Sequence, residues 1–360
     1  MFSMDQQKGM NIMITKHVKN LPSKLVVNTP GSFIGKTSRQ IVVRKDRKKV
    51  VEYPSLYLKD IIITGKGIAL SSDVIEYCAS NDIPILFISP TGKTTAMFTI
   101  PYSSCANLGI LQLQALQKPG ISIGLASKFI YGKINNQINL LQSIQKNNKS
   151  YTFLEKPINK MKKSLYDFKT NKKIHSATTI FNIEAMVAKQ YWYAIKMIFN
   201  RPFQFNGRHK QHAGDLVNSM LNYGYAILEG RVRLGIIRSG LNAEIGFLHA
   251  IQKGRASLVF DLMEEFRTSV VDQTVFALLN QEKNLSVTDK GRLSESTKTV
   301  LINAILNQLN HSVRFFGKKQ KIEEIIENQA ISIAKYLSQS QKYHPFIQTY
   351  HKKRSIFGAK

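Results

Sequence analysis

The spacing of hydrophobic positions changes partway along the chain. Over residues 24–104, short apolar runs such as LVVN, RQIVV, DIIIT and PILFI alternate with turn residues, among them Pro30 and Gly31. Runs rich in β-branched residues between turn signals are typical of strands. The segment SSDVIEYCASND departs from this pattern and predicts one short helix that begins after a serine. We therefore predict a small β-rich domain over residues 24–104.

From residue 105 onwards, apolar residues recur every three or four positions, which is the period of an amphipathic helix. The pattern is long in GLASKFIYGKINNQINLLQSIQ, SATTIFNIEAMVAKQYWYAIKMIF and SLVFDLMEEFRTSVVDQTVFALL. It predicts a larger all-α domain over residues 105–343, so the fold class is α+β with two domains. Residues 344–360 read as a basic tail, and residues 1–23 as an N-terminal extension that the pattern does not place.

The chain is strongly basic, with 51 Lys and Arg residues against 23 Asp and Glu and a formal net charge of +28. A folded surface with this excess repels itself unless a polyanion is bound, so nucleic acid is the expected partner. An anionic membrane is the alternative, but the sequence has no basic amphipathic helix and no lipidation signal. A Lys- and Asn-rich composition drawn from an AT-rich genome is an explanation that needs no partner.

The sequence also indicates a compartment. No segment approaches the roughly 18 apolar residues that span a bilayer, and the N-terminus lacks the apolar core of a signal peptide. The two cysteines, Cys78 and Cys105, are too few for a disulfide framework or a zinc site. We expect a cytoplasmic protein without a membrane partner.

Two motifs resemble functional sequences but lack the required spacing or context. In PGSFIGKTS, Gly31 and Gly35 are one residue too close for a Walker A loop, and a strand pattern follows where that loop needs a helix. We expect residues 31–37 to connect two strands and to bind no nucleoside triphosphate. His209 and His212 form an H-x-x-H pair without nearby carboxylates or thiolates, so their basic loop is expected to contact phosphate rather than a metal.

Polar residues interrupt three otherwise apolar helical segments: Glu184, His249, and the pair Asp261 and Glu264 one turn apart in FDLMEEFR. Taken alone, a glutamate at the edge of a helical face or a histidine in a core is more simply explained by packing. Together, two carboxylates and a neutral imidazole form an oxygen and nitrogen site suited to Mn²⁺ or Mg²⁺. Such an ion beside a basic surface indicates phosphoryl transfer.

Blocks of the helical half follow one another in a specific order: E-A-x-x-A-x-x-Y-W, L-N-x-x-x-G-F-L-H, G-R-x-S-L and D-L-M-E-E-F-R. TPGSFIGK and LYLKDIIITGKGIALSSDVIEYCASNDIPILFI in the β-rich half, and YHPFI near the end, extend the pattern. These blocks resemble the CRISPR-associated integrase family, the catalytic, DNA-joining subunit of the spacer-acquisition complex. The chain departs from the family in GRHKQHAGD, where a proline-rich basic stretch ending in Asp-Pro is common, and at Ala243-Glu244, where Asp-Pro is usual.

The resemblance implies roles for the candidate residues. Glu184, His249 and Glu264 match the family's metal ligands and are the expected catalytic groups. Asp261 matches an additional acid beside the site and completes the expected catalytic set. Arg267 matches a basic position close to the DNA. We expect further DNA contacts from Arg255, Arg208 and Lys210.

The resemblance also implies an architecture and an activity. The β-rich domain would be sandwich-like and serve dimerisation and DNA contact, while homodimers would flank a small dimeric partner protein. The expected activity is that of a metal-dependent endonuclease and integrase of antiviral immunity, acting on double-stranded DNA, both prespacer and CRISPR repeat. A 3′-hydroxyl of the short foreign DNA would attack a phosphodiester of the array. Two alternatives stay open: a casposase-like transposase, and a catalytically silent nucleic-acid-binding scaffold.

Overall fold

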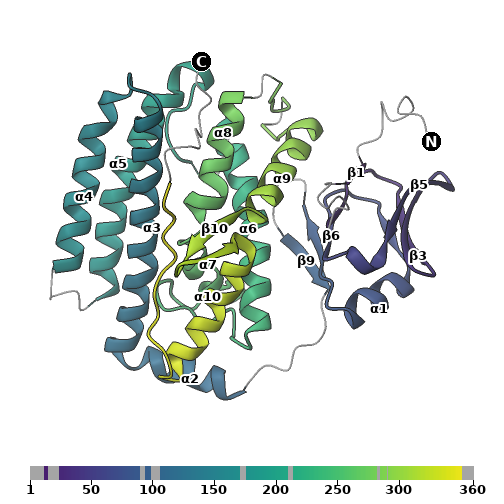
Figure 1. The fold of residues 1–360 in the computed structure, drawn as a ribbon, viewed down its shortest axis with the longest axis horizontal. Coiled ribbons are helices and arrows are strands. Elements are labelled where there is room, and N and C mark those ends of the chain that lie inside the picture. The colour runs from purple at the N-terminus through teal and green to yellow at the C-terminus, as the bar shows by residue number, and fades with distance from the viewer. Residues whose placement is uncertain are drawn as a thin grey trace. The chain divides into compact units, whose positions relative to one another are not determined.

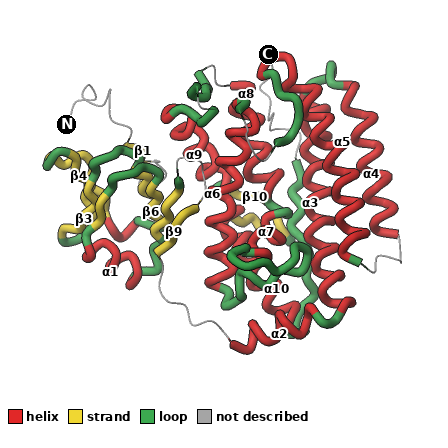
Figure 2. Tube along the Cα trace, turned by 180° about the vertical axis from the view of Figure 1, so that it is seen from behind, coloured by secondary structure: helices red, strands yellow, loops and turns green. Residues whose placement is uncertain are grey.

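The computed structural model describes residues 12–14, 24–89, 94–98, 106–170, 176–209, 214–281, 284–289 and 291–350. The chain divides into two units between residues 101 and 102 (Figures 1 and 2). The first unit is rich in strands and the second is largely helical, so the predicted α+β fold class is confirmed.

Among its described residues, the first unit contains two sheets and one α-helix (Figure 1). One sheet has the strand order β1-β2-β6-β8-β9, and the other has the order β5-β4-β3-β7. Strands β2, β6 and β8 run parallel, and the edge strands β1 and β9 run antiparallel to their neighbours. The elements are β1 (Ile12–Ile14), β2 (Lys24–Val27), β3 (Phe33–Thr37), β4 (Gln40–Lys45), β5 (Lys48–Pro54), the 3₁₀ turn η2 (Ser55–Tyr57), β6 (Asp60–Ile63), β7 (Ala69–Leu70), α1 (Ser72–Ser80), β8 (Ile85–Ile88) and β9 (Thr94–Phe98).

The inner strands carry continuous apolar runs because they are buried on both sides. β2 and β6 are buried along their whole length, which is typical of parallel strands covered on both faces. The core combines residues of both sheets and of α1, among them Leu25, Ile41 and Val74. Lys24 is also buried, and its ammonium lies 3.7 Å from the carboxylate of Asp60. Two sheets that share one apolar core agree with a sandwich-like arrangement.

The segment around Lys36 is a strand and not, as the sequence suggested, a connection between strands. β3 pairs antiparallel with β4 along its length, with Gly35 opposite Val42. The turn is confined to the residues before it, where Gly31 has a φ of 78°. The next element is strand β4 rather than a helix N-terminus, and the Lys36 ammonium donates to the carbonyl of Ser38 at 2.9 Å.

Long helices lie side by side in the second unit (Figure 1). Helices α3, α4 and α5 pack against one another, and α6 packs against α7, α9 and α10. Serine and aspartate caps start two of these helices: Ser176 accepts from the backbone N–H of Thr179, and Asp215 from that of Asn218. The elements are α2 (Ala106–Leu116), α3 (Pro119–Asn147), the 3₁₀ turn η3 (Thr152–Leu154), α4 (Glu155–Thr170), α5 (Ala177–Phe203), α6 (Leu216–Arg238), α7 (Ser257–Met263), the π-helical turn η4 (Arg267–Asp272), α8 (Gln273–Gln281), α9 (Glu295–Leu309), β10 (Ser312–Phe315), β11 (Lys318–Lys321) and α10 (Ile322–Leu337).

Two features differ from the all-α prediction for this unit. Strands β10 and β11 form an antiparallel hairpin, whose turn places Phe316 and Gly317 at positive φ. The apolar run from Ser257 to Gln281, which predicts one helix, is broken: α7 ends at Met263, and η4 follows before α8. π-helical turns are frequent at functional sites. Here the interruption coincides with a group of buried carboxylates that have different partners.

The segment after α10 packs along α3, although the sequence suggested a tail from residue 344 (Figure 1). Tyr343 and Phe346 are fully buried. The backbone carbonyl of Phe346 accepts from the amide of Asn136 at 2.9 Å. At Gly132 a Cβ would meet Pro345 at 3.0 Å, so a larger residue would push this segment outward. The remaining positions of the expected tail, 351–360, lie outside the described residues.

Glu265 anchors the same segment from the other side. Its buried carboxylate accepts hydrogen bonds from the hydroxyl of Tyr343, the amide of Gln329 and the backbone N–H of Phe346. A buried carboxylate is costly unless such donors satisfy it. The C-terminal segment therefore supplies polar partners as well as apolar packing to the helical core.

Phe346→Ala should lower the free energy of unfolding by about 3–5 kcal/mol, because the change empties a fully buried site. The ring also stacks on Phe266, with 5.0 Å between the centroids. Urea unfolding measures the loss, and Tyr166→Ala on the exposed surface of α4 is the control, with a change within about 0.5 kcal/mol. A loss at Phe346 no larger than that of the control would contradict a structural role for the segment.

Candidate active site

One pocket of about 440 Å³ in the helical unit brings together most of the residues expected to act in chemistry or DNA binding. Its lining includes Glu184, His249, Glu264, Arg208, Arg255 and Arg267, together with Lys133, Trp192, Tyr225 and Asp272. Asp261 lies behind this lining, in contact with His249. Lys210 and His212 lie outside the described residues.

The two glutamates of the pocket share one cation. The ammonium of Lys133 lies 2.5 Å from Oε1 of Glu184 and 2.7 Å from Oε2 of Glu264. Arg267 donates to the other oxygen of Glu264 at 2.9 Å. Burial alone would raise the pKa of Glu264, but Arg267 and Lys133 outweigh it and hold that pKa at about 2. Glu264 is therefore a fully ionised carboxylate between two positive charges.

His249 is oriented by the buried carboxylate of Asp261. Oδ1 of Asp261 lies 2.7 Å from Nδ1 of the imidazole. A carboxylate accepts, so Nδ1 donates, and the lone pair of the neutral ring is on Nε2. The same carboxylate accepts from the backbone N–H groups of Phe247, Leu248 and His249 at 2.6–3.0 Å. Asp261 thus holds both the loop and the ring.

The loop at His249 approaches α7 so closely that a side chain at Gly246 would not fit. A Cβ there would meet Oδ2 of Asp261 at 2.8 Å and the backbone of Ser257 at 2.8 Å. Glycine at this position therefore allows the backbone amides of the loop to reach the carboxylate.

The arginines of the pocket stack on aromatic rings. The guanidinium of Arg267 lies 4.9 Å from the ring centroid of Tyr225, and that of Arg208 lies 5.4 Å from the same ring. Arg208 also lies over Trp192, and its guanidinium donates to the side chains of Asn218 and Asn222. Stacking and side-chain hydrogen bonds restrict both guanidinium groups before any ligand arrives.

Asp272 fixes the aromatic side of the pocket. Its buried carboxylate accepts from the hydroxyls of Tyr191 and Tyr225. Burial raises the pKa of Asp272, and burial together with this carboxylate raises the pKa of both tyrosines well above their usual value. The tyrosines therefore remain neutral donors, and Tyr225 is held in place under the arginines.

The donors present suit a divalent cation, provided that the ammonium of Lys133 moves away from the two glutamates. Among the residues that the structure describes, no three His, Cys, Asp or Glu side chains are close enough to hold an ion as they stand. Two carboxylates and the Nε2 of an oriented imidazole are nevertheless the donors that Mg²⁺ and Mn²⁺ accept. Both glutamates already direct an oxygen at one positive charge, the ammonium of Lys133.

Among the pocket residues that sequence analysis did not single out are Lys133, Tyr225 and Asp272. A signal for Lys133 is present in the sequence, because it lies next to Ile130 and Ile134 on the apolar face of a predicted helix. A charge at such a position needs a buried partner. The local sequence does not show which residue is that partner.

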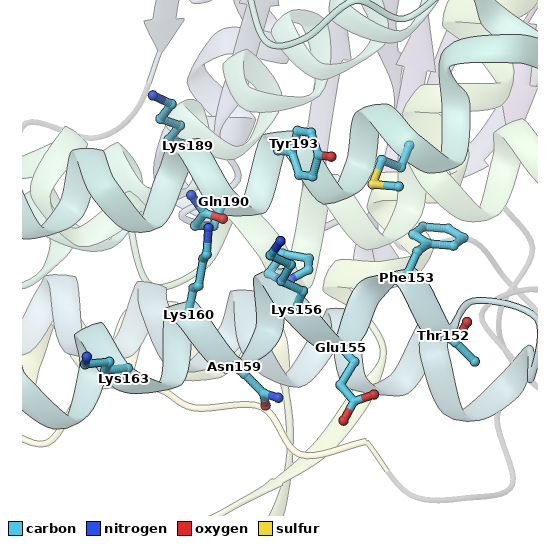
Figure 3. Close-up of a pocket in the computed structure, with 12 residues that line it drawn as sticks. Thr152, Phe153, Glu155, Lys156, Asn159, Lys160, Lys163, Lys189, Gln190 and Tyr193 are labelled. Carbon is cyan, nitrogen blue, oxygen red and sulfur yellow. The ribbon is translucent and has the colours of Figure 1, made fainter.

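A larger hollow of about 950 Å³ lies between α4 and α5 (Figure 3). Lys156 and Lys160 extend from α4 toward α5, where Tyr193 lies. Its lining contains four lysines and a single acid, Glu155, and no histidine or cysteine. It offers no ligand set for a metal, so the chemistry is assigned to the smaller pocket.

In the part of the chain that the structure describes, no helix combines the length and the apolar character needed to cross a membrane.

Sequence comparison identifies relatives over most of the chain. The model of the family described as CRISPR associated protein Cas1 matches residues 25–307. A CRISPR-associated endonuclease Cas1 from Francisella tularensis subsp. novicida is 30% identical over 325 residues, covering 90% of this chain and 98% of the relative. A CRISPR-associated endonuclease Cas1 from Archaeoglobus fulgidus is 29% identical over 349 residues, covering 90% and 99%.

Solved structures share the fold. A casposase bound to integration product has a TM-score of 0.79 at 24% identity, covering 92% of this chain and 96% of that one. A chain of a Cas6-RT-Cas1–Cas2 complex has a TM-score of 0.71 at 18% identity, covering 90% and 36%. A Cas1 protein from Thermotoga maritima has a TM-score of 0.70 at 18% identity, covering 91% and 100%. At these identities the likeness establishes the fold alone.

The protein is a CRISPR-associated endonuclease, as its full-length relatives and its two-sheet and helical architecture define it. It belongs to the Cas1 family, the enzymes that integrate spacers into CRISPR arrays. The family that the motifs predicted is thereby confirmed, and the alternative of a catalytically silent scaffold is set aside.

Asp261→Asn should destabilise the protein by about 1–3 kcal/mol. The NH₂ group of asparagine would replace a carboxylate oxygen that accepts from backbone N–H groups in the wild type, so these donors would lose their acceptor. Thermal or urea unfolding measures the loss. Asp167→Asn on α4, away from the pocket, is the matched control and should change stability by less than about 0.5 kcal/mol. Equal stability of the two variants would show that Asp261 does not hold the loop.

Proposed function

We propose that this pocket carries out strand transfer, in which the 3′-hydroxyl of a short DNA attacks a phosphodiester at the edge of a CRISPR repeat. The observation that supports it most is the convergence of Glu184, Glu264 and His249 on one pocket that also holds three arginines. Carboxylates and an imidazole supply cation ligands, and guanidinium groups bind phosphate. The two kinds of group lie side by side, as phosphoryl transfer requires.

Glu184, Glu264 and His249 are the proposed ligands of Mg²⁺ or Mn²⁺. When bound, the ion would polarise the attacked phosphate and activate the attacking oxygen. Asp261 acts as a positioning residue for the imidazole rather than as a ligand, because backbone and ring donors already occupy its two oxygens. The tight hold of Asp261 keeps Nε2 of His249 available to the site.

Arg267 and Arg208 are proposed to bind the phosphate under attack. Both are stacked on Tyr225, so little side-chain freedom remains to be lost when DNA binds. Arg255 lies 5.5 Å from the ring of Phe260 at the edge of the same pocket and would contact a neighbouring phosphate. Lys210 is proposed as a further contact from the loop that follows Arg208.

The wider assembly follows from the proposed reaction. The substrates are double-stranded DNA, a prespacer and a repeat, and the net charge of +28 suits them. Joining both ends of one DNA needs two active sites, so we propose a homodimer, with the β-rich unit in dimerisation and DNA contact. The Cas1–Cas2 complex among the structural neighbours supports a small dimeric partner of the Cas2 kind. The protein would work in the cytoplasm, where the array lies.

Integration of a labelled short duplex into a supercoiled plasmid that carries a candidate repeat tests the proposed function. His249→Ala should reduce joining by roughly 10²-fold or more, because a ligand is lost, while most DNA affinity remains. His344→Ala, near the C-terminal end of the described chain and outside the pocket lining, is the control. Full joining by His249→Ala would contradict the assigned site.

A plasmid without the repeat separates spacer integration from the casposase-like alternative, which the fold likeness to a casposase keeps in view. We expect joined product at the repeat boundary of the first plasmid and little in the second. Equal joining to both plasmids at unrelated sites would favour the transposase.

Arg267→Ala should lower the joining rate by roughly 10²-fold but change DNA affinity by less than about threefold, because its guanidinium lies at the site of reaction. Arg314→Ala, on an exposed strand of the same unit, should lower only affinity and its salt dependence. The measurement is the binding constant and the joining rate over a salt series. Equal loss of both quantities in Arg267→Ala would make Arg267 one more phosphate contact.

A further inference from the structure

Lys133 occupies a position that its sequence surroundings do not favour. It lies on the apolar face of α3, where Ile130 and Ile134 are buried, and only 13% of its side chain is exposed. An ammonium at such a depth is costly unless carboxylates compensate it. Glu184 on α5 and Glu264 after α7 provide that compensation from two other elements.

The ammonium holds the two carboxylates together. Glu264 is 7% exposed and Glu184 is 24% exposed, so without Lys133 two like charges would face each other in a pocket with little water. Arg267 neutralises Glu264 at its other oxygen, at 2.9 Å. Burial alone would lower the pKa of Lys133, but Glu264 and Glu184 raise it, so the side chain stays charged.

The same position conflicts with a divalent ion shared by both glutamates. Mg²⁺ binds carboxylate oxygens at about 2.0–2.1 Å, so an ion shared by both glutamates would take the position that Nζ holds between these oxygens at 2.5 and 2.7 Å. An ion and an ammonium also repel each other strongly where little water screens them. The ion can bind both glutamates only if the ammonium moves away.

We propose that Lys133 is a built-in competitor of the metal: its ammonium fills the cation position of the metal-free enzyme and is displaced when the divalent ion binds. Lys133 thereby holds the proposed ligands close together, and it sets the apparent metal affinity. This inference rests on the proposed metal role of Glu184 and Glu264. It concerns binding that precedes the reaction, so it is testable without DNA.

Lys133→Met tests the competition, because methionine keeps an unbranched side chain and removes the charge. Mn²⁺ binding to the DNA-free protein is measured by electron paramagnetic resonance of the free ion. Since the apparent affinity is the intrinsic affinity multiplied by the fraction of protein in which the site is free, the variant should bind Mn²⁺ about tenfold more tightly than wild type. In EDTA its Tm should fall by about 5 °C, and Mn²⁺ should restore it.

Two further variants control for charge and folding. Lys146→Met removes a charge from an exposed position near the C-terminal end of α3 and should leave Mn²⁺ affinity unchanged. Lys133→Arg keeps a cation beside the glutamates, so it should bind Mn²⁺ no more tightly than wild type and should be more stable in EDTA than Lys133→Met. The arginine variant gives an answer even if Lys133→Met does not fold without metal.

Glu184→Gln separates failure of this inference from failure of the proposed metal site. If wild type binds Mn²⁺ and Glu184→Gln weakens that binding, the site stands. In that case equal or weaker Mn²⁺ binding by Lys133→Met, or tighter binding by Lys133→Arg than by wild type, would overturn the competition alone. Mn²⁺ binding that Glu184→Gln leaves unchanged would overturn both.

Discussion

Burial of carboxylates in an apolar core is the constraint on which the helical unit depends. A short stretch of chain around the end of α7 buries four acids, and each is satisfied by a different part of the molecule. Asp261 accepts hydrogen bonds from the backbone of the loop at His249, and Glu264 pairs with Lys133 and Arg267. Glu265 accepts from the C-terminal segment, and Asp272 accepts from two tyrosines. Because an unpaired buried charge is so costly, these contacts hold segments that are distant in the sequence in fixed positions relative to one another. The pocket is a consequence of that network.

The helix is interrupted where these acids lie. In an unbroken helix, residues three and four apart share a face, so acids at 261, 264, 265 and 272 would gather on adjoining faces. α7 ends at Met263, before Glu264 and Glu265, and of the four acids Asp272 lies in the π-helical turn Arg267–Asp272. Asp261 then faces the histidine loop, while Glu264 faces α3 and the pocket. The local distortion is stabilised by the partners that it reaches.

The pocket is arranged in advance of its ligands. Tyr225, held by Asp272, supports two guanidinium groups, and Asp261 orients the imidazole of His249. Preorganised charge acts more strongly than mobile surface charge because little side-chain freedom is lost on binding. In the proposed function, the +28 net charge attracts DNA in general, whereas these few fixed cations position one phosphate. Affinity and reaction rate are therefore expected to respond to different residues.

The sequence by itself determined the two-part α+β fold, because a change of hydrophobic period is a local property that each segment carries. It also determined the family, since blocks around Glu184, His249 and Glu264 occur in a specific order. It did not reveal that residues 33–37 form a strand or that residues 343–350 pack along the helices, because these outcomes depend on neighbours supplied by other segments. Only the tertiary structure decided that Asp261 faces the loop rather than the pocket, and that Lys133 lies between the two glutamates. Residues far apart along the chain meet there because each buried charge needs a partner, and the folded backbone alone determines which partner is within reach.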